Sequence, residues 1–327
     1  MIRLRVVPLA LFAVLAFSTR AALARPIDAR PAAAAAANTS PTLVSADLPT
    51  TFLRTVIALP YQSLQTIARA HRMSVKRLVA LNPGLRRENL QQGDAVVVID
   101  SLESLPRLPD SRAELARGVR GRKQIALTFD CGWVDKNDLD RLLSVLRHHD
   151  MKASFFLTGI FFRVNPGGLN VLARAGYPLY NHSQTHPHFT TLGNTQAQAE
   201  LLRVEKTVRT STSLTTRPFW RPPFGDRDAR ILDAAAAIGF RSVYWTIDSH
   251  DSATSPTLNP KQLFKRVCRE PFRRTMSDPD PLDGAIVLFH GAARATPDAL
   301  EMIIPYLRRK GYEFVDLPTL ISPCALR

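Results

Sequence analysis

The feature that most constrains this chain is a regular alternation of short β-like runs with helical patterns in its second half. Apolar strings typical of buried strands are separated by stretches in which apolar residues recur at the spacing of one helix face. The β-like runs lie at 125–129, 153–157, 178–180, 217–220, 241–247, 285–289 and 312–315. Such alternation predicts a parallel α/β sheet, because each helix returns the chain to the start of the next strand.

Polar and reactive side chains follow directly after most of these runs. They are Asp130, His182, His186, Arg221, Asp248, Asp251 and His290. In an open sheet, strands about 4.8 Å apart would spread these strand ends over more than ~20 Å. A closed barrel brings them to one mouth, where such folds place their active sites. We therefore predict a distorted, incomplete (β/α) barrel of about seven strands instead of a doubly wound sheet.

Residues 1–24 have the pattern of a secretory signal peptide. Two arginines precede an apolar run, and small residues precede a predicted cleavage after Ala24. The run is shorter than the ~20 apolar residues that span a bilayer, and no later stretch reaches that length, so we predict no membrane span. The mature protein is expected in the periplasm or secreted. Residues 25–50 are rich in alanine and proline, which predicts a linker.

The chain is strongly basic, with a formal net charge of +15 over 327 residues. Loss of the three arginines of the signal peptide leaves 15 − 3 = +12. Because export separates the protein from nucleic acid, this charge favours anionic cell-wall polymers or membrane surfaces as partners. A solvated basic surface explains the charge equally well.

Residues 51–100 predict two short helices between short strands. The segments YQSLQTIA at 61–68, MSVKRLVALNP at 73–83 and NLQQGD at 89–94 resemble a LysM module. LysM modules bind glycans that contain N-acetylglucosamine, so the resemblance implies a βααβ glycan-binding module. The family's usual Gly-Asp-Thr before the first helix is replaced here by LPYQS at 59–63, and a small helical spacer is the alternative. Residues 101–121 are expected to form a second linker.

Several residues are suited to hydrolytic chemistry. The spacing of His182 and His186 would put two imidazoles on one face of a helical turn, which suits a divalent metal. Asp130 ends an apolar run, where a carboxylate is a base, a metal ligand or a helix cap. Arg221, followed by two prolines, can hold a carboxylate ionised. His290 ends another apolar run as a candidate general acid or as a core histidine.

Five segments, taken in order, resemble the motifs of the polysaccharide deacetylases, carbohydrate esterases built on the nodulation-protein deacetylase domain. They are TFDCG at 128–132, HSQTH at 182–186, RPPFG at 221–225, WTIDSHD at 245–251 and LFH at 288–290. The resemblance predicts a deacetylase domain over 122–320 with a distorted seven-stranded barrel. It implies removal of N-acetyl groups from N-acetylglucosamine-containing glycans, with peptidoglycan the expected substrate.

The resemblance also implies a metal centre and a base. Asp130 would be the general base, positioned by Arg221. His182 and His186 would be ligands of a divalent ion, with Zn²⁺ the expected metal.

Further roles follow from the same resemblance. His290 would be the general acid, with Asp251 its tuning partner and Asp248 the second choice for that role. Leu288 would line the acetyl pocket, and the backbone N–H near Phe224 would help to hold the oxyanion.

The chain departs from this family at two positions. Cys131 stands where the family usually has a second aspartate that binds metal, and Ser252 stands where it usually has tryptophan. We expect the Cys131 thiolate to ligate the ion, which would favour zinc. If the side chain instead points away, water completes a two-histidine site. Trp133 is a candidate replacement for the aromatic wall.

Three questions remain open from the sequence. A degenerate barrel would leave a non-catalytic wall-binding protein, and the same apparatus would serve an O-acetyl esterase on polysaccharide. Cys268 and Cys324 either form a disulfide or stay free.

Overall fold

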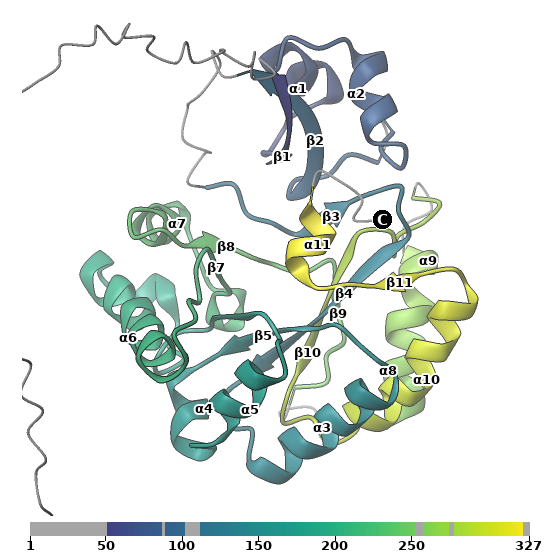
Figure 1. The fold of residues 1–327 in the computed structure, drawn as a ribbon. Helices are drawn as coiled ribbons and strands as arrows, with labels where there is room; N and C mark the ends of the chain where they lie inside the picture. The colour runs from purple at the N-terminus through teal and green to yellow at the C-terminus, as the bar shows by residue number, and fades with distance from the viewer. Residues whose placement is uncertain (1–50, 87–88, 102–111, 253–257, 275–277, 323–327) are drawn as a thin grey trace, which may run out of the picture. The chain divides into compact units, whose positions relative to one another are not determined.

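A computed structural model describes residues 51–86, 89–101, 112–252, 258–274 and 278–322 (Figure 1). The predicted signal peptide and the alanine- and proline-rich linker lie outside the described residues, as does Cys324. Within the described part of the chain, no helix has the length and apolar character needed to cross a membrane.

The first described elements follow the order strand, helix, helix, strand. They are β1 (Thr51–Ile57), α1 (Leu64–Ala70), α2 (Val75–Leu81) and β2 (Asp94–Ser101). The two strands pair antiparallel. Ser63 and Ser74 cap the two helices through their hydroxyl groups, which satisfies backbone N–H groups that a helix start leaves unpaired. Buried apolar side chains from both helices and from β2 form a separate small core.

The rest of the described chain builds a curled sheet. Its strands are β3 (Arg117–Val119), β4 (Gln124–Cys131), β5 (Ser154–Leu157), β6 (Leu179–Asn181), β7 (Phe219–Trp220), β8 (Arg241–Ser242), β9 (Ile247–Asp248), β10 (Ala285–His290) and β11 (Glu313–Phe314). Strands β10, β4, β5, β6, β7 and β8 pair in that order, all parallel. A bridge from Leu115 to Val243 and the pairing of β3 with β10 bring the two edges together. The predicted distorted barrel is therefore confirmed.

Helices lie around the outside of this sheet (Figure 1). They are α3 (Lys136–His148), α4 (Gly159–Val164), α5 (Gly168–Arg174), α6 (Asn194–Thr212), α7 (Ala229–Ala236), α8 (Pro260–Cys268), α9 (Glu270–Arg274), α10 (Thr296–Arg309) and α11 (Leu317–Ile321). The apolar faces of α3 and α10 are buried against the sheet. The short α11 instead contributes Leu317 and Leu320 to the barrel interior.

The alternation of side chains along β4 determines which residues face the barrel interior. Odd-numbered side chains from Ile125 to Cys131 pack in the layer between sheet and helices. Ala126 belongs to the interior cluster, and Thr128 and Asp130 point the same way. The last interior position at the carboxyl end of β4 is thus Asp130.

One prediction about the chain path was wrong. The run expected at 241–247 is two strands, β8 and β9, because the chain turns there to reach β10: Tyr244 donates to the Leu115 carbonyl and Thr246 to that of Ile286. The second expected linker contains β3 and the buried residues that precede it. Its short length hides this strand from a periodicity argument.

The βααβ unit is joined to the barrel by more than the chain. β2 pairs parallel with β3, so that the sheet continues from one to the other. Asp94 of β2 lies 3.4 Å from the Arg117 guanidinium, and both side chains are buried. At Gly84 an added Cβ would lie 2.2 Å from the Gly121 nitrogen, so only glycine allows this close backbone approach.

Candidate active site

Asp130 and His290 are neighbours across the sheet. The parallel pairing of β4 with β10 places them opposite each other in register. Both occupy interior positions at the carboxyl ends of their strands, and paired strands lie about 4.8 Å apart. The sheet therefore brings together a carboxylate and an imidazole that are 160 residues apart in the sequence, as 290 − 130.

Arg221 holds the Asp130 carboxylate in position from inside the barrel. It follows β7, is fully buried, and donates from Nη1 to Asp130 Oδ1 at 2.7 Å and to the Thr128 hydroxyl at 3.0 Å. The rest of the guanidinium donates to the backbone carbonyls of Val243 and Tyr244, both at 3.2 Å. With so many partners the guanidinium has a fixed position beneath the carboxylate.

The surroundings of Asp130 keep it charged. Burial alone would raise its pKa, but the positive charge and hydrogen bond of Arg221, together with the nearby His290, outweigh burial and hold the pKa below its ordinary value. Asp130 is therefore an ionised carboxylate at neutral pH, as a general base must be.

His182 and His186 come together through a loop, so the predicted helical turn was wrong. The loop has no helical assignment, and Ser183 and His186 adopt left-handed φ angles of 71° and 60°. The two rings meet edge to face with centroids 4.9 Å apart. Glu200 accepts hydrogen bonds from the Thr185 N–H and hydroxyl, at 2.7 and 3.0 Å, which holds the loop in this strained form.

Both histidines are held in the neutral form. Burial lowers the pKa of His182, and Asp130 only partly offsets that effect. Burial and the neighbouring His182 lower the pKa of His186 to about 4. Neutral imidazole is the form that binds metal ions, because one ring nitrogen then carries a lone pair.

His290 has the opposite electrostatic setting. Its Nδ1 lies 2.8 Å from Asp251 Oδ1, and its backbone N–H donates to the same carboxylate. The Thr296 hydroxyl also donates to Asp251. Burial would lower the pKa of His290, but the hydrogen bond and charge of Asp251 raise it above its ordinary value. Asp248 instead accepts from the His250 N–H, so Asp251 is the direct partner of His290.

Phe224 and Leu288 occupy different parts of the site. Phe224 has a left-handed φ of 58°, and its side chain is an exposed aromatic surface, with 62% of the residue accessible. Its ring is stacked on His188 at 4.3 Å and meets His186 edge to face at 4.6 Å. Leu288 is buried on β10 and shares the register of Thr128, one interior position below His290.

The structure does not bring Cys131 to the histidines. Its side chain is fully buried among the apolar residues beneath the helices, with Sγ 3.8 Å from the Phe129 carbonyl oxygen. Burial raises the pKa of the thiol strongly, which disfavours a thiolate. The expectation of a Cys131 ligand is corrected here, because strand alternation turns Cys131 away from the face that carries Asp130.

Several residues of the site were missed or left aside by sequence reasoning. Thr128 and Thr296 position Arg221 and Asp251 through their hydroxyl groups. Thr128 lay within a recognised motif, whereas Thr296 carried no local signal. Trp133 is 67% exposed, and its ring centre lies 5.8 Å from the Arg163 guanidinium.

Comparison with known proteins agrees with this geometry. Residues 117–243 match the family model for polysaccharide deacetylases. The chain is 28% identical over 210 residues to the peptidoglycan-N-acetylmuramic acid deacetylase PdaA of Bacillus subtilis, which covers 64% of this chain and 76% of that protein. It is 27% identical over 209 residues to the peptidoglycan-N-acetylglucosamine deacetylase of Bacillus cereus, at 63% and 70% coverage.

A solved structure adds a contrasting case. BA3943 of Bacillus anthracis, described as a CE4 family pseudoenzyme, superposes with a TM-score of 0.58 at 25% identity. The match covers 76% of this chain and 80% of that one. The solved structures that resemble this chain therefore include one that is described as a pseudoenzyme.

Proposed function

Because residues 117–243 of this chain match the family model for polysaccharide deacetylases, we propose that it is an exported hydrolase that removes N-acetyl groups from N-acetylglucosamine-containing glycans, with peptidoglycan as the substrate. One observation carries this proposal. Asp130 and His290 face each other in register, and their environments move their pKa values in opposite directions. A pair separated in this way supplies a base and an acid at the same pH.

The residues divide the reaction between them. Asp130 takes a proton from the water that attacks the acetamide carbonyl carbon, which forms a tetrahedral oxyanion. The C–N bond then breaks as His290 delivers its proton to the departing nitrogen, because an amine anion is too poor a leaving group. Acetate and a free amine on the sugar are the products. Arg221 keeps Asp130 charged, and Asp251 favours the protonated form of His290.

The two loop histidines fit a divalent metal ion. Nδ1 of His182 lies 2.8 Å from the Arg221 carbonyl oxygen, which only accepts hydrogen bonds, so Nδ1 carries the proton. Nε2 then presents a lone pair 3.4 Å from Asp130 Oδ2. Two electron-rich atoms in this arrangement favour a cation beside them, and the backbone contact is one that metal-binding histidines usually make. His182 and His186 would hold the ion, and zinc suits such donors.

When bound, such an ion would polarise the amide carbonyl and lower the pKa of water from ~15.7 toward ~7. The protein adds donors where negative charge develops, which we assign to the backbone of the turn at Phe224. An aromatic face at Phe224 also suits stacking on a sugar ring. Leu288 lines the apolar floor that would receive the acetyl methyl group.

A cleft beside the barrel offers a path for a longer glycan. Its volume is about 260 Å³, and residues from both the βααβ unit and the barrel line it, including Gln91, Gln92, Asp248 and His250. Hydroxyl-rich polymers need such polar groups for recognition. We infer that the βααβ unit, which resembles LysM, binds glycan and delivers it along this cleft.

Two other functions remain candidates. Likeness to a pseudoenzyme and a Cys131 turned from the histidines favour a non-catalytic wall-binding protein as the second choice. The Arg221–Asp130 contact and the position of His290 opposite Asp130 favour a catalytic protein. An O-acetyl esterase would use the same groups, since ester and amide hydrolysis pass through similar oxyanions.

The deciding experiment uses the mature chain, residues 25–327, with added Zn²⁺. Peptidoglycan, chitooligosaccharides and an O-acetylated polysaccharide are each incubated with the protein, and released acetate is measured. The proposal expects acetate from peptidoglycan and a free amine on the product. Asp130→Asn is the matched control and should lose at least ~100-fold in rate, because the amide cannot accept the proton. No acetate from any substrate would overturn the deacetylase proposal and favour the wall-binding alternative.

A further inference from the structure

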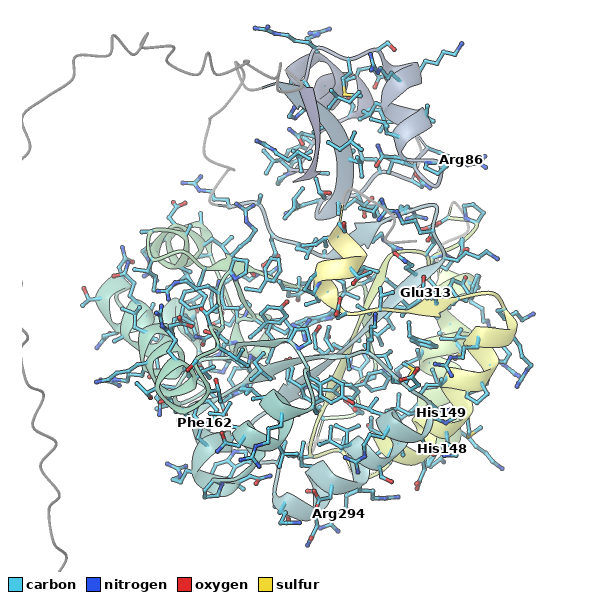
Figure 2. The ribbon with its side chains drawn as sticks, in the orientation of Figure 1. Arg86, His148, His149, Phe162, Arg294 and Glu313 are labelled. Atoms are coloured by element: carbon cyan, nitrogen blue, oxygen red, sulfur yellow. The ribbon has the colours of Figure 1, made fainter. Side chains whose placement is uncertain are left out.

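A second group of metal-binding side chains lies on the outer surface of the barrel. Among the residues that the structure describes, His148, His149 and Glu301 form the group whose potential ligand atoms all lie within 4.8 Å of one another. His148 is the last residue of α3, His149 follows it, and Glu301 lies on α10 (Figure 2). Because α3 starts after the carboxyl end of β4 and runs back along the barrel, the group lies toward the end opposite Asp130.

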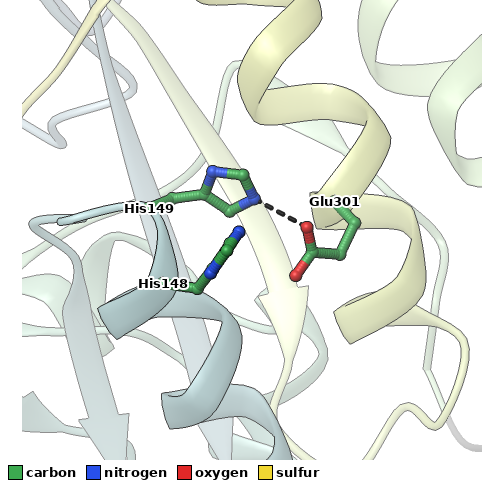
Figure 3. Close-up of side chains that lie close together, drawn as sticks. All are labelled: His148, His149 and Glu301. Carbon is green, nitrogen blue, oxygen red and sulfur yellow. Dashed lines mark hydrogen bonds and ion pairs between the residues drawn. The ribbon is translucent and has the colours of Figure 1, made fainter.

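The three side chains converge (Figure 3). His149 Nε2 lies 2.8 Å from Glu301 Oε2, and the two imidazoles meet edge to face with centroids 4.8 Å apart. A tetrahedral ion with bonds of ~2.0–2.1 Å spaces its ligand atoms by about 3.3 Å. Small rotations of the exposed His148 and Glu301 side chains would bring the three ligand atoms to that spacing.

The helices that carry these residues are fastened to each other independently of any ion. Arg141 of α3 pairs with Asp298 of α10 at 2.6 Å, and Arg308 of α10 donates to the His149 carbonyl at 2.6 Å. The His149 side chain is only 12% exposed. Its ring is thus held in place beside Glu301, which reduces the entropy lost when an ion binds.

The ligand types select the kind of ion. The Arg308 guanidinium donates to the His149 carbonyl, and its positive charge opposes the binding of any cation, so the bonds to the ligands must outweigh it. Hard ions such as Mg²⁺ and Ca²⁺ take oxygen ligands, of which the group offers one carboxylate. Zn²⁺, Ni²⁺ and Cu²⁺ form strong bonds to imidazole and tolerate this setting better.

We propose that His148, His149 and Glu301 form a surface site for a borderline transition-metal ion, with Zn²⁺ the preferred occupant, that clamps the end of α3 to α10. Two imidazoles and one carboxylate leave one coordination position for water. The site is separate from His182 and His186 and takes no part in the hydrolysis.

The test isolates this site from the candidate catalytic one. The tag-free mature chain carries His182→Ala and His186→Ala, and Zn²⁺ alone is titrated into it calorimetrically. One equivalent of Zn²⁺ should bind. Adding Glu301→Gln or His149→Gln should weaken binding by at least ~10-fold, because even the loss of an outer-shell partner costs ~10–100-fold. Asp140→Asn, which removes an exposed carboxylate of α3 that pairs with Lys136 of the same helix, is the matched control and should retain the affinity.

Two further readouts keep the test decisive. Electron paramagnetic resonance of the Cu²⁺-loaded chain should show two nitrogen ligands, and one after His149→Gln. If the histidine double variant does not fold, the otherwise unmodified chain should lose one zinc equivalent on Glu301→Gln. Absence of zinc uptake at this site, or uptake unchanged by both Glu301→Gln and His149→Gln, would overturn the proposal.

Discussion

Arg221 Nη1 lies 2.7 Å from Asp130 Oδ1, and both side chains are buried. Removing one partner of such a pair leaves a buried charge without compensation, which costs about 3–5 kcal/mol. We expect Arg221→Met to raise the pKa of Asp130, to abolish acetate release near neutral pH and to lower the free energy of unfolding by that amount. Arg221→Lys should be intermediate, because an ammonium group cannot reach all the partners of the guanidinium.

The measurement is chemical denaturation together with the pH dependence of acetate release. Arg217→Met is a suitable control, because that arginine pairs with Glu205 away from the barrel mouth. Full activity in Arg221→Met would contradict the assignment of Asp130 as an arginine-held base.

The Asp251–His290 pair predicts an alkaline limit for activity. Asp251 raises the pKa of His290 above its ordinary 6.5, so the acid form persists to higher pH and is lost as pH rises through the raised pKa. The same pairing contributes stability that is complete below 6.5 and disappears over that window, since the folded state binds the proton more tightly than the unfolded state.

Asp251→Asn should therefore move the alkaline limb of kcat/KM to lower pH. It should also flatten the stability difference between neutral and alkaline pH. A profile with an unmoved alkaline limb would assign that limb to another group.

His182 and His186 should determine how tightly the candidate active site binds a metal ion. We expect His182→Ala and His186→Ala each to lower zinc affinity sharply and to abolish turnover, because each removes one of few ligands. His188→Ala is the matched control: His188 lies on the same loop but stacks on Phe224 and faces Asp226 at 3.6 Å. Zinc affinity at the mouth that survives in both ligand variants would refute the two-histidine site.

Cys131 should prove to be a packing residue. Cys131→Ala is expected to retain zinc affinity and activity while losing about 1 kcal/mol of stability, as a small cavity opens beneath the helices. Cys131→Asp should be less stable still, because it buries a carboxylate among apolar side chains. Zinc titration and thermal unfolding of both variants check this. Loss of zinc affinity in Cys131→Ala would reinstate the thiolate ligand.

The βααβ unit should not be removable without damage to the barrel. Deleting residues 25–105 takes away β2, the pairing partner of β3, and leaves the buried Arg117 without Asp94. We expect a lower Tm and weaker hydrolysis even of short soluble oligomers. Deleting only residues 25–50 is the control and should change neither. An unaltered Tm after the longer deletion would show that the two parts are independent.

Much of the fold could be predicted because it depends on local periodicity. The apolar faces of α3 and α10 repeat at helical spacing, and β4, β5 and β10 lie in runs of 8, 4 and 6 residues that are rich in apolar side chains, so both signals are visible in a short window. β3 and the break between β8 and β9 could not be found in this way. The strands β3, β8 and β9 are only two or three residues long. They are stabilised by pairing with strands that are distant in the sequence, and a short window does not contain those partners.

The sequence by itself determined that Asp130, Arg221 and His290 stand at strand ends, because each comes at the end of an apolar run. The carboxyl ends of parallel strands meet at one edge of a sheet, so these residues were also expected to lie together. Tertiary structure alone decided which face of β4 is the interior, and so that Asp130 enters the site while Cys131 packs beneath helices. It also decided that the two loop histidines meet through left-handed residues held by Glu200, and that Thr296 supports Asp251. These outcomes depend on contacts between segments far apart in the chain, and no local pattern carries that information.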